Sequence, residues 1–86
     1  AVILNRSLTF AKQMIENGEH NSQKIIHEVT TMIRSVNPTG IDYVELVDAI
    51  NLETTTTLKS GETVLIPIAV RFGTTRLIDN VVLTVR

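Results

Sequence analysis

The chain has 86 residues, carries 8 Lys and Arg against 9 Asp and Glu, and is 43% apolar. These values favour one small globular domain, residues 1–86, over a disordered chain. Because the chain has no cysteine, a disulfide scaffold, thiolate catalysis and cysteine-ligated zinc are excluded. The balanced charge removes the usual electrostatic argument for binding nucleic acid.

The first four residues are apolar, but Asn5 and Arg6 interrupt them before a signal peptide or a membrane span could form. We therefore expect a cytoplasmic protein with no membrane contact. The chain does not begin with methionine, and its first residues already follow a helical pattern. We expect it to be part of a longer protein.

Two amphipathic helices are predicted in the first half of the chain. Leu4, Leu8, Ala11 and Ile15 follow one another at spacings of four, three and four residues, which indicates a helix that runs to about residue 17. Gly18 then supplies the left-handed backbone conformation that commonly closes a helix.

A second apolar stripe predicts a helix that stops before residues 37–40. The stripe consists of Ile25, Ile26, Val29, Met32, Ile33 and Val36. Asn21 or Ser22 can cap the start of this helix with a side-chain oxygen. Since the turn between the two helices is short, we expect them to be antiparallel.

Beyond Gly40 the apolar residues alternate instead, which predicts a strand from Ile41 to Val47. Residues 63–72 form a nearly continuous apolar run that is typical of a central strand. Pro67 lies inside this run and cannot donate a ladder hydrogen bond, so we expect a bulge there or an amide position that faces an edge.

Gly73 and Thr74 allow a tight reversal into a third strand, residues 75–83. The predicted fold class is therefore α+β, with two antiparallel helices packed on a small, mainly antiparallel three-stranded sheet in the order ααβββ. We expect the helix pair to cover one face of that sheet.

The candidates for metal binding and nucleophilic catalysis are weak. His20 and His27 are not at the spacing that a shared metal would need, so we expect no metal site. None of the four serines has a histidine at a suggestive position or lies in a G-x-S-x-G elbow. These serines are Ser7, Ser22, Ser35 and Ser60.

Acidic residues lie along and just after the first predicted strand and could form a cluster. They are Asp42, Glu45, Asp48 and Glu53. Since Asp42 and Glu45 alternate to opposite faces of a regular strand, a solvated strand edge is favoured over a general acid/base pair. We interpret the four threonines at 54–57 as an extended surface segment.

Residues 73–76, Gly-Thr-Thr-Arg, carry donors that could bind phosphate. A phosphate loop needs a longer glycine-bounded loop, a lysine and a following helix, whereas a strand follows here, so a hairpin turn is favoured. Arg76 and Asp79 lie three residues apart in this strand and should point to opposite faces, each toward a different partner. An inward-pointing Asp79 or Asn80 would need a hydrogen bond from backbone or from an arginine.

Two stretches are more specific than these candidates. Residues 41–48, IDYVELVD, resemble the DYVE-[IL]-VD strand of the pantothenate synthetase family, also called pantoate-beta-alanine ligase. Residues 68–80, IAVRFGTTRLIDN, resemble the closing AVR-x-G-x-TRLIDN signature of that family. Residues 4–8 further resemble the first helix of the family's C-terminal domain. The resemblance covers nearly the whole chain, with Ala49 standing where many members have proline.

The resemblance implies a role in an ATP-dependent ligase. The family joins pantoate to beta-alanine through an enzyme-bound pantoyl adenylate, uses ATP with magnesium, and is expected to form homodimers. Its nucleotide is held by an N-terminal Rossmann-like domain with an HIGH-like motif and by a KMSKS-like serine-rich loop, neither of which occurs in this chain. The resemblance therefore implies a lid that packs on the N-terminal nucleotide-binding domain and has no catalytic, cofactor-binding or metal-binding residue of its own.

Two other functions remain open. The first is a free-standing α+β module whose sheet or helical face binds a protein partner. The second, ranked last, is a small nucleic-acid-binding domain, for which Arg71, Arg76 and Arg86 barely provide a basic stripe. Because a lid without its partner exposes apolar surface, we also hypothesise concentration-dependent dimerisation of the isolated chain.

Overall fold

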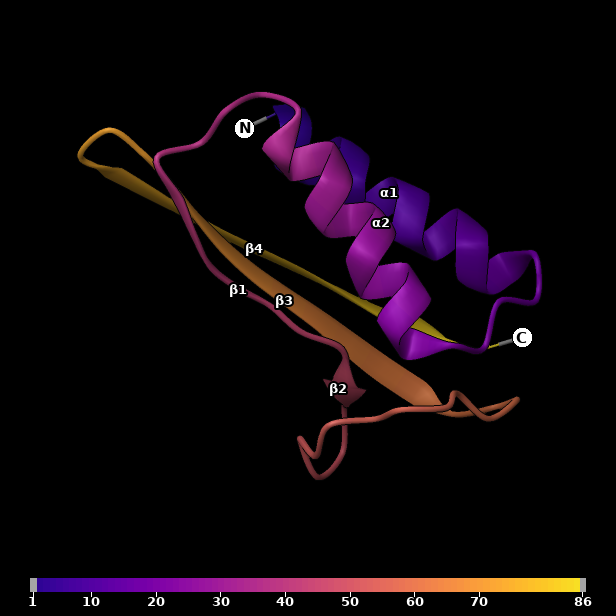
Figure 1. Cartoon of the computed structure of the whole chain (residues 1–86). Coiled ribbons are helices and arrows are strands. Elements are labelled where there is room, and N and C mark those ends of the chain that lie inside the picture. The colour runs from indigo at the N-terminus through magenta and orange to yellow at the C-terminus, as the bar shows by residue number, and fades with distance from the viewer. Residues whose placement is uncertain (1, 86) are drawn as a thin grey trace.

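The computed structural model describes residues 2–85 and contains two helices followed by a four-stranded antiparallel sheet. Helix α1 spans Val2–Glu16 and helix α2 spans Ser22–Arg34. The two helices run antiparallel, side by side, on one side of the sheet (Figure 1). This confirms the α+β class and the helix pair that the sequence predicted.

The turn between the helices uses the residues that the sequence pointed to. Gly18 has a φ of 96°, a left-handed conformation that glycine adopts without steric cost, and its N–H donates to Ile15 O at 3.1 Å. Asn21 is the N-cap of α2, and its side chain accepts from Lys24 N at 3.2 Å. Ser22 is the first residue of α2.

The sheet is built around one long strand. Strand β3 spans Thr63–Phe72 and pairs along its whole length with β4, Thr75–Thr84, across the two-residue turn at Gly73. On its other edge β3 pairs with β1, Gly40–Val44, and then with β2, Val47–Asp48. The hairpin expected from Gly73-Thr74 is confirmed.

The expected first strand, residues 41–47, is divided into β1 and β2, so the sheet has four strands instead of the predicted three. Leu46 lies between the two pieces and is fully buried in the core, because the chain turns its side chain inward there. Pro67 of β3 stands opposite the break between β1 and β2, and its carbonyl accepts from Glu45 N at 3.1 Å. Because the N–H and C=O of a strand residue point to the same neighbouring strand, the missing N–H of Pro67 also faces this break and not β4. The ladder between β3 and β4 has no bulge at Pro67; the register shift lies in β1, between Ile41 and Tyr43.

The core lies between the helices and one face of the sheet. The inward residues of β3, Val64, Ile66, Ile68 and Val70, are buried against apolar side chains of both helices. One expectation fails here: Val36 belongs to the predicted stripe, but α2 ends at residue 34 and Val36 is 45% exposed.

The opposite face of the sheet is not covered by any element within residues 2–85 (Figure 1). We call it the outer face. Its residues are those that alternate with the core residues along the strands. On β3 and β4 the apolar ones are Leu65, Pro67, Ala69, Ile78 and Val82, and on β1 and β2 they are Tyr43 and Val47.

Candidate functional site

The two stretches that carry the family resemblance meet on the outer face. Asp42 of β1 forms two ion pairs. Its Oδ1 lies 2.8 Å from Arg71 Nε, and its Oδ2 lies 2.8 Å from Arg76 Nε. The Asp42 side chain is 24% exposed, whereas about half of each arginine side chain is exposed. One carboxylate therefore joins three strands, β1, β3 and β4, at one end of the sheet.

A bulge places Asp42 in this position. Ile41 pairs with Val70 and Tyr43 with Ala69, so Asp42 is an extra residue with no partner of its own in β3. A bulge of this kind re-aims a side chain relative to strict alternation. The prediction of a solvated strand edge is therefore incomplete, because the Asp42 carboxylate is bound by two arginines.

The hairpin explains why a counter-charge is needed here. Arg71 and Arg76 lie directly opposite each other, and like charges in that position destabilise a sheet. The sequence contained a signal for this contact. A two-residue turn at residues 73–74 pairs residue 72 with residue 75, and therefore places Arg71 opposite Arg76. Sequence reasoning nevertheless missed the acidic partner that such a pair of arginines needs.

Gly40 also belongs to this arrangement. A Cβ at this position would lie 2.8 Å from Arg71 Nη2, so the absence of a side chain gives the guanidinium room to lie against the backbone. Thr39 fastens the adjacent turn, because its hydroxyl accepts from Gly73 N at 2.7 Å and its own N–H donates to Arg71 O at 2.8 Å. The amide of Gly73 is thus engaged within the fold.

The other acidic residues do not form an acid/base pair with Asp42. Asp48 Oδ1 accepts from Ile50 N at 2.7 Å and from Asn51 N at 3.2 Å, so this carboxylate shapes the turn after β2. The backbone N–H of Asp48 donates to Glu53 O at 2.9 Å. These bonds are structural.

The threonine run and two serines also serve the fold. Ser22 is buried and its hydroxyl donates to Thr56 O at 3.0 Å, which ties the start of α2 to the threonine segment. Ser7 is buried inside α1 and donates to Ile3 O at 2.8 Å. Thr54, Thr56 and Thr57 are exposed, as expected for a surface segment.

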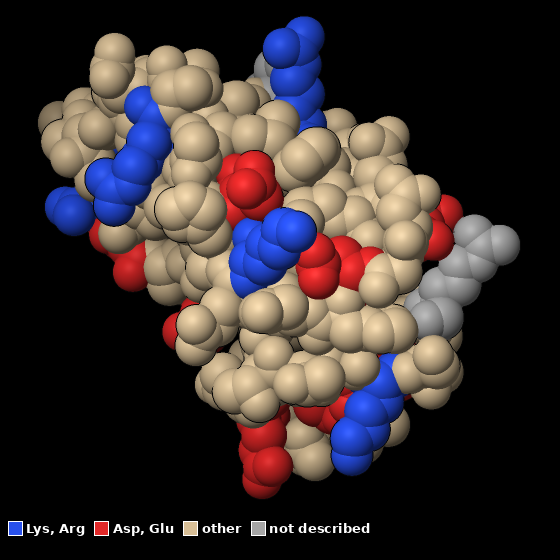
Figure 2. Space-filling view, turned by 45° about the vertical axis from the view of Figure 1, so that its right-hand side comes forward, with Lys and Arg blue, Asp and Glu red and all other residues tan. Residues whose placement is uncertain are grey.

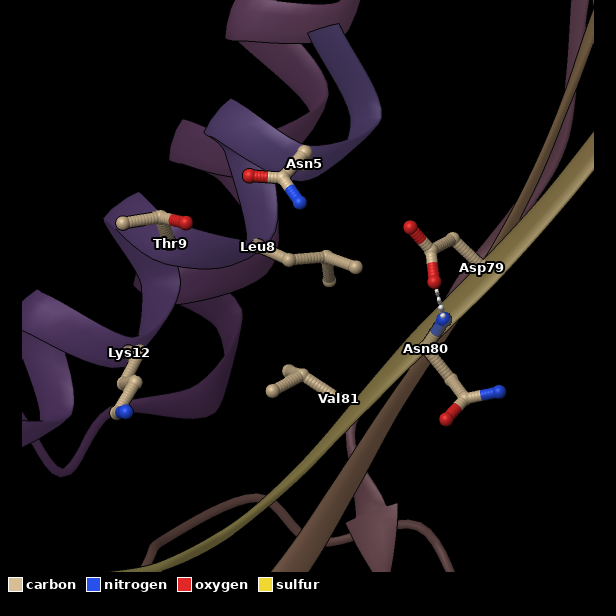
Figure 3. A pocket seen from close by; sticks show the side chains of 7 residues that line it. All are labelled: Asn5, Leu8, Thr9, Lys12, Asp79, Asn80 and Val81. Carbon is tan, nitrogen blue, oxygen red and sulfur yellow. Dashed lines mark hydrogen bonds between the residues drawn. The ribbon is translucent and has the colours of Figure 1, made fainter. Parts of the chain in front are cut away.

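A small cleft lies between α1 and β4 (Figure 3). In this view Leu8 points from α1 toward the sheet, and Asp79 and Val81 point from β4 toward the helix, whereas Asn80 points away. Asp79 Oδ1 accepts from Asn80 N at 2.8 Å. Asp79 and Arg76 therefore face opposite sides of β4 and have different partners, as predicted.

This cleft has the wrong size for a nucleotide. Its volume is about 250 Å³, which is below the usual range for pockets that enclose a small ligand. Lys12 and Asn5 line it from α1. Among residues 2–85, no group of three or more His, Asp or Glu side chains could hold a metal ion.

Charged side chains are dispersed over the surface. Figure 2 shows basic and acidic residues intermixed on the face in view, without a continuous basic stripe. Arg86, the third arginine considered for such a stripe, lies outside the described residues. No helix within the described part of the chain is long and apolar enough to cross a membrane.

Comparison with known proteins gives a consistent result. A family model described as Pantoate-beta-alanine ligase matches residues 1–82. A pantothenate synthetase from Enterococcus faecalis is 48% identical over 80 residues, which are 93% of this chain and 28% of that protein. One from Acetivibrio thermocellus is 44% identical over 85 residues, covering 99% of this chain and 30% of that protein.

The fold is also found in a solved structure. A crystal structure of pantothenate synthetase from Thermus thermophilus superposes with a TM-score of 0.75 and 24% identity, and covers 92% of this chain and 28% of that one. At this identity the likeness concerns the fold. The chain thus spans less than a third of the length of the relatives that it matches.

Proposed function

Because the chain belongs to the pantoate-beta-alanine ligase family, we propose that residues 1–86 form the C-terminal domain of an enzyme that makes pantothenate from pantoate and beta-alanine. The carboxylate of pantoate would attack the α-phosphate of ATP, forming an adenylate and releasing pyrophosphate. The amine of beta-alanine would then attack the acyl carbon and displace AMP. One observation carries the proposal: nearly all of this chain matches the synthetases, yet it corresponds to only 28–30% of their length.

The domain would act as a lid. An acyl adenylate is a reactive anhydride, and water competes with the amine unless the site is closed. The engaged polar groups of this chain support a structural contribution, because Asp42, Asp48 and Ser22 all make bonds within the fold. Binding of ATP and magnesium would belong to the N-terminal domain of the same chain, and the enzyme would work in the cytoplasm.

Deleting residues 1–86 from the full-length enzyme tests this function. The remaining part should still bind ATP but make pantothenate far more slowly, with part of the adenylate hydrolysed or released. The measurement is single-turnover formation of pantoyl adenylate and of pantothenate by rapid quench. As a control, calorimetric titration of the 86-residue chain with ATP, magnesium and pantoate should give no saturable heat.

Two results would contradict the proposal. Wild-type rates for both steps in the truncated enzyme, without loss of adenylate, would mean that the domain is not a lid. Saturable heat from the 86-residue chain would mean that it carries nucleotide-binding groups of its own.

A further inference from the structure

The outer face of the sheet has an unusual composition for a surface in contact with water. A sheet with one covered face usually alternates apolar residues inward with polar residues outward. Here Ile78 and Val82 stand on the outer face with 59% and 58% of their surfaces exposed. The register places Val82 opposite Leu65 and Ile78 opposite Ala69. Two apolar rows therefore cross the sheet, one on each side of Asn80 and Pro67, which pair with each other.

These rows continue onto the other edge of β3. Val47 pairs with Leu65, and Tyr43 pairs with Ala69. Val47 and Ala69 are buried, yet they are not members of the core cluster between sheet and helices. Leu65 and Ala69 of β3 thus have apolar partners on both neighbouring strands, and these side chains form a patch that is three strands wide.

Polar residues border this patch at both ends. Thr63 pairs with Thr84 at one end, and Arg71 pairs with Arg76 at the other, where Asp42 joins them. Asn80 and, beside Pro67, Glu45 are exposed polar residues between the two apolar rows. Apart from them the patch is apolar inside and polar at its ends, as protein interfaces usually are. About half of each arginine side chain is exposed beside Asp42, so an acceptor on a partner can reach both arginines.

The outer surface of the helical layer is different. Its exposed residues are mainly charged or polar: Arg6, Lys12, Gln13, Glu16, Gln23, Lys24, His27 and Arg34. Shallow grooves there are lined by Phe10 together with Met14 or Met32, which are only half-buried. The large apolar side chains that are mostly exposed on regular elements, Ile78 and Val82, lie on the sheet.

We propose that the outer face of the sheet, and not the helical layer, is the surface on which the remainder of the enzyme's own chain packs, with a carboxylate or another anion of that part against Arg71 and Arg76. This inference rests on the proposed function, because it identifies the side of the lid that faces its partner. More than two thirds of each relative's length lies outside the segment that this chain spans, so a partner within the same polypeptide is available. Covalent linkage gives that partner a high effective concentration.

A second copy of this chain is a poorer occupant. In a two-fold contact the same patch meets itself, so the arginines would need an acidic group on the outer face of the other copy. Asp42 is unsuitable, because its own arginines already bind both of its oxygens. The other acidic residue next to this face is Glu45, which is exposed between β1 and β2. A second copy would thus offer these arginines one carboxylate and would lack the covalent linkage that raises the effective concentration of the remaining chain.

Cysteine labelling tests the inference, because the 86-residue chain contains no cysteine of its own. Single variants Ile78→Cys and Val82→Cys probe the outer face. Gln13→Cys is the matched control on the helical layer, beside the groove formed by Phe10 and Met32. Each variant is made in the full-length enzyme and in the 86-residue chain. Its modification by a maleimide is followed by mass spectrometry of the labelled peptide, with ATP, magnesium and pantoate present.

We expect the two outer-face thiols to react at least about tenfold more slowly in the full-length enzyme than in the 86-residue chain, because burial makes a thiol inert. The thiol introduced at position 13 should react at similar rates in both. Circular dichroism of each variant checks that the fold is intact.

Three results would overturn the inference. Protection at position 13 that equals or exceeds protection at 78 and 82 would assign docking to the helical layer. Equal labelling in both proteins at all three positions would mean that the outer face stays open. Protection that appears in the 86-residue chain and increases with its concentration would identify a second copy as the occupant. Catalysis by the full-length enzyme is measured separately, so a failure of the ligase assignment is distinguishable from a failure of the docking surface.

Discussion

The two faces of the sheet are built from the same strands but have different surroundings. On the inner face Val64, Ile66 and Ile68 have almost no exposed surface, because the helix pair covers them. On the outer face Ile78 and Val82 are as apolar but remain more than half exposed. Apolar composition alone therefore does not identify the core; a residue joins the core only where another element covers it.

In β4 the two faces of the sheet receive similar kinds of residue. Leu77, Asp79, Val81 and Leu83 face the helices, whereas Ile78, Asn80 and Val82 face outward. Each face therefore receives both apolar residues and a polar residue at the middle of the strand. A strand of this kind is stable beside a single layer of helices, but its outer side offers area for a second contact.

The largest effect is expected from an identical substitution on each face. Ile66→Ala on the inner face should lower the free energy of unfolding by about 2–5 kcal/mol, because the side chain is 1% exposed and a cavity remains. Ile78→Ala on the outer face should cost below about 1 kcal/mol, since most of its side chain is already in water. Urea unfolding of the 86-residue chain measures both.

The same two variants show whether the outer face is covered in the full-length enzyme. In the full-length enzyme the cost of Ile78→Ala should rise toward that of a buried residue if the outer face is covered there. Equal costs for the two variants in the 86-residue chain would show that the outer face is already packed in isolation, for example by self-association.

An intermediate effect is expected at the charged rim of the outer face. Asp42→Asn removes the charge that joins Arg71 to Arg76 and leaves two like charges opposite each other. We expect a loss of roughly 1 kcal/mol in the free energy of unfolding at low salt, because all three side chains are partly exposed. The loss should decrease as salt rises, since ions screen such contacts.

The control is Glu16→Gln, which removes the same charge from the exposed end of α1. It should change stability much less and with little salt dependence. If Asp42→Asn behaves like this control in denaturant titrations at several salt concentrations, then the arginine contacts do not stabilise the sheet.

The smallest effect concerns the helical side of the molecule, at the turn before α2. Glu19 Oε2 accepts from Asn21 N at 3.2 Å, and Oε1 lies 3.2 Å from Lys24 Nζ. The backbone hydrogen bond and then the lysine favour the charged form, so the pKa of Glu19 lies below its model-compound value of 4.5. The stabilisation should be complete above pH 4.5 and be lost as pH falls through the lower pKa of the folded state.

Glu19→Gln tests this directly. The variant should lack that part of the acid-induced loss of stability, while Glu16→Gln should keep it. Denaturant midpoints of the three proteins, measured from neutral pH down to acid, give the comparison. Parallel pH profiles for wild type and Glu19→Gln would show that the carboxylate contributes nothing to folding.

Local features of the sequence predicted much of the fold. The apolar spacing in the first half of the chain located both helices, and Gly18 with Asn21 located the turn between them. The pair Gly73-Thr74 located the hairpin. These predictions succeeded because helix periodicity, capping and two-residue turns depend on neighbours close in the chain.

The broken first strand and the arginine contacts of Asp42 depend on neighbours far along the chain. Asp42 meets Arg71 and Arg76 only because the sheet brings strands together, and a bulge turns Asp42 toward them. No local pattern marks Leu46 as the residue that turns inward between β1 and β2.

The sequence by itself determined the helix pair, the hairpin, the absence of cysteine chemistry and the family signatures, because each of these is encoded in residue identity and short spacing. Only the tertiary structure decided which apolar residues are core and which form the exposed patch on the outer face. The physical reason is that Ile66 and Ile78 have the same side chain and the same strand preference. Their burial differs because of what packs above them, and that depends on elements distant in the chain.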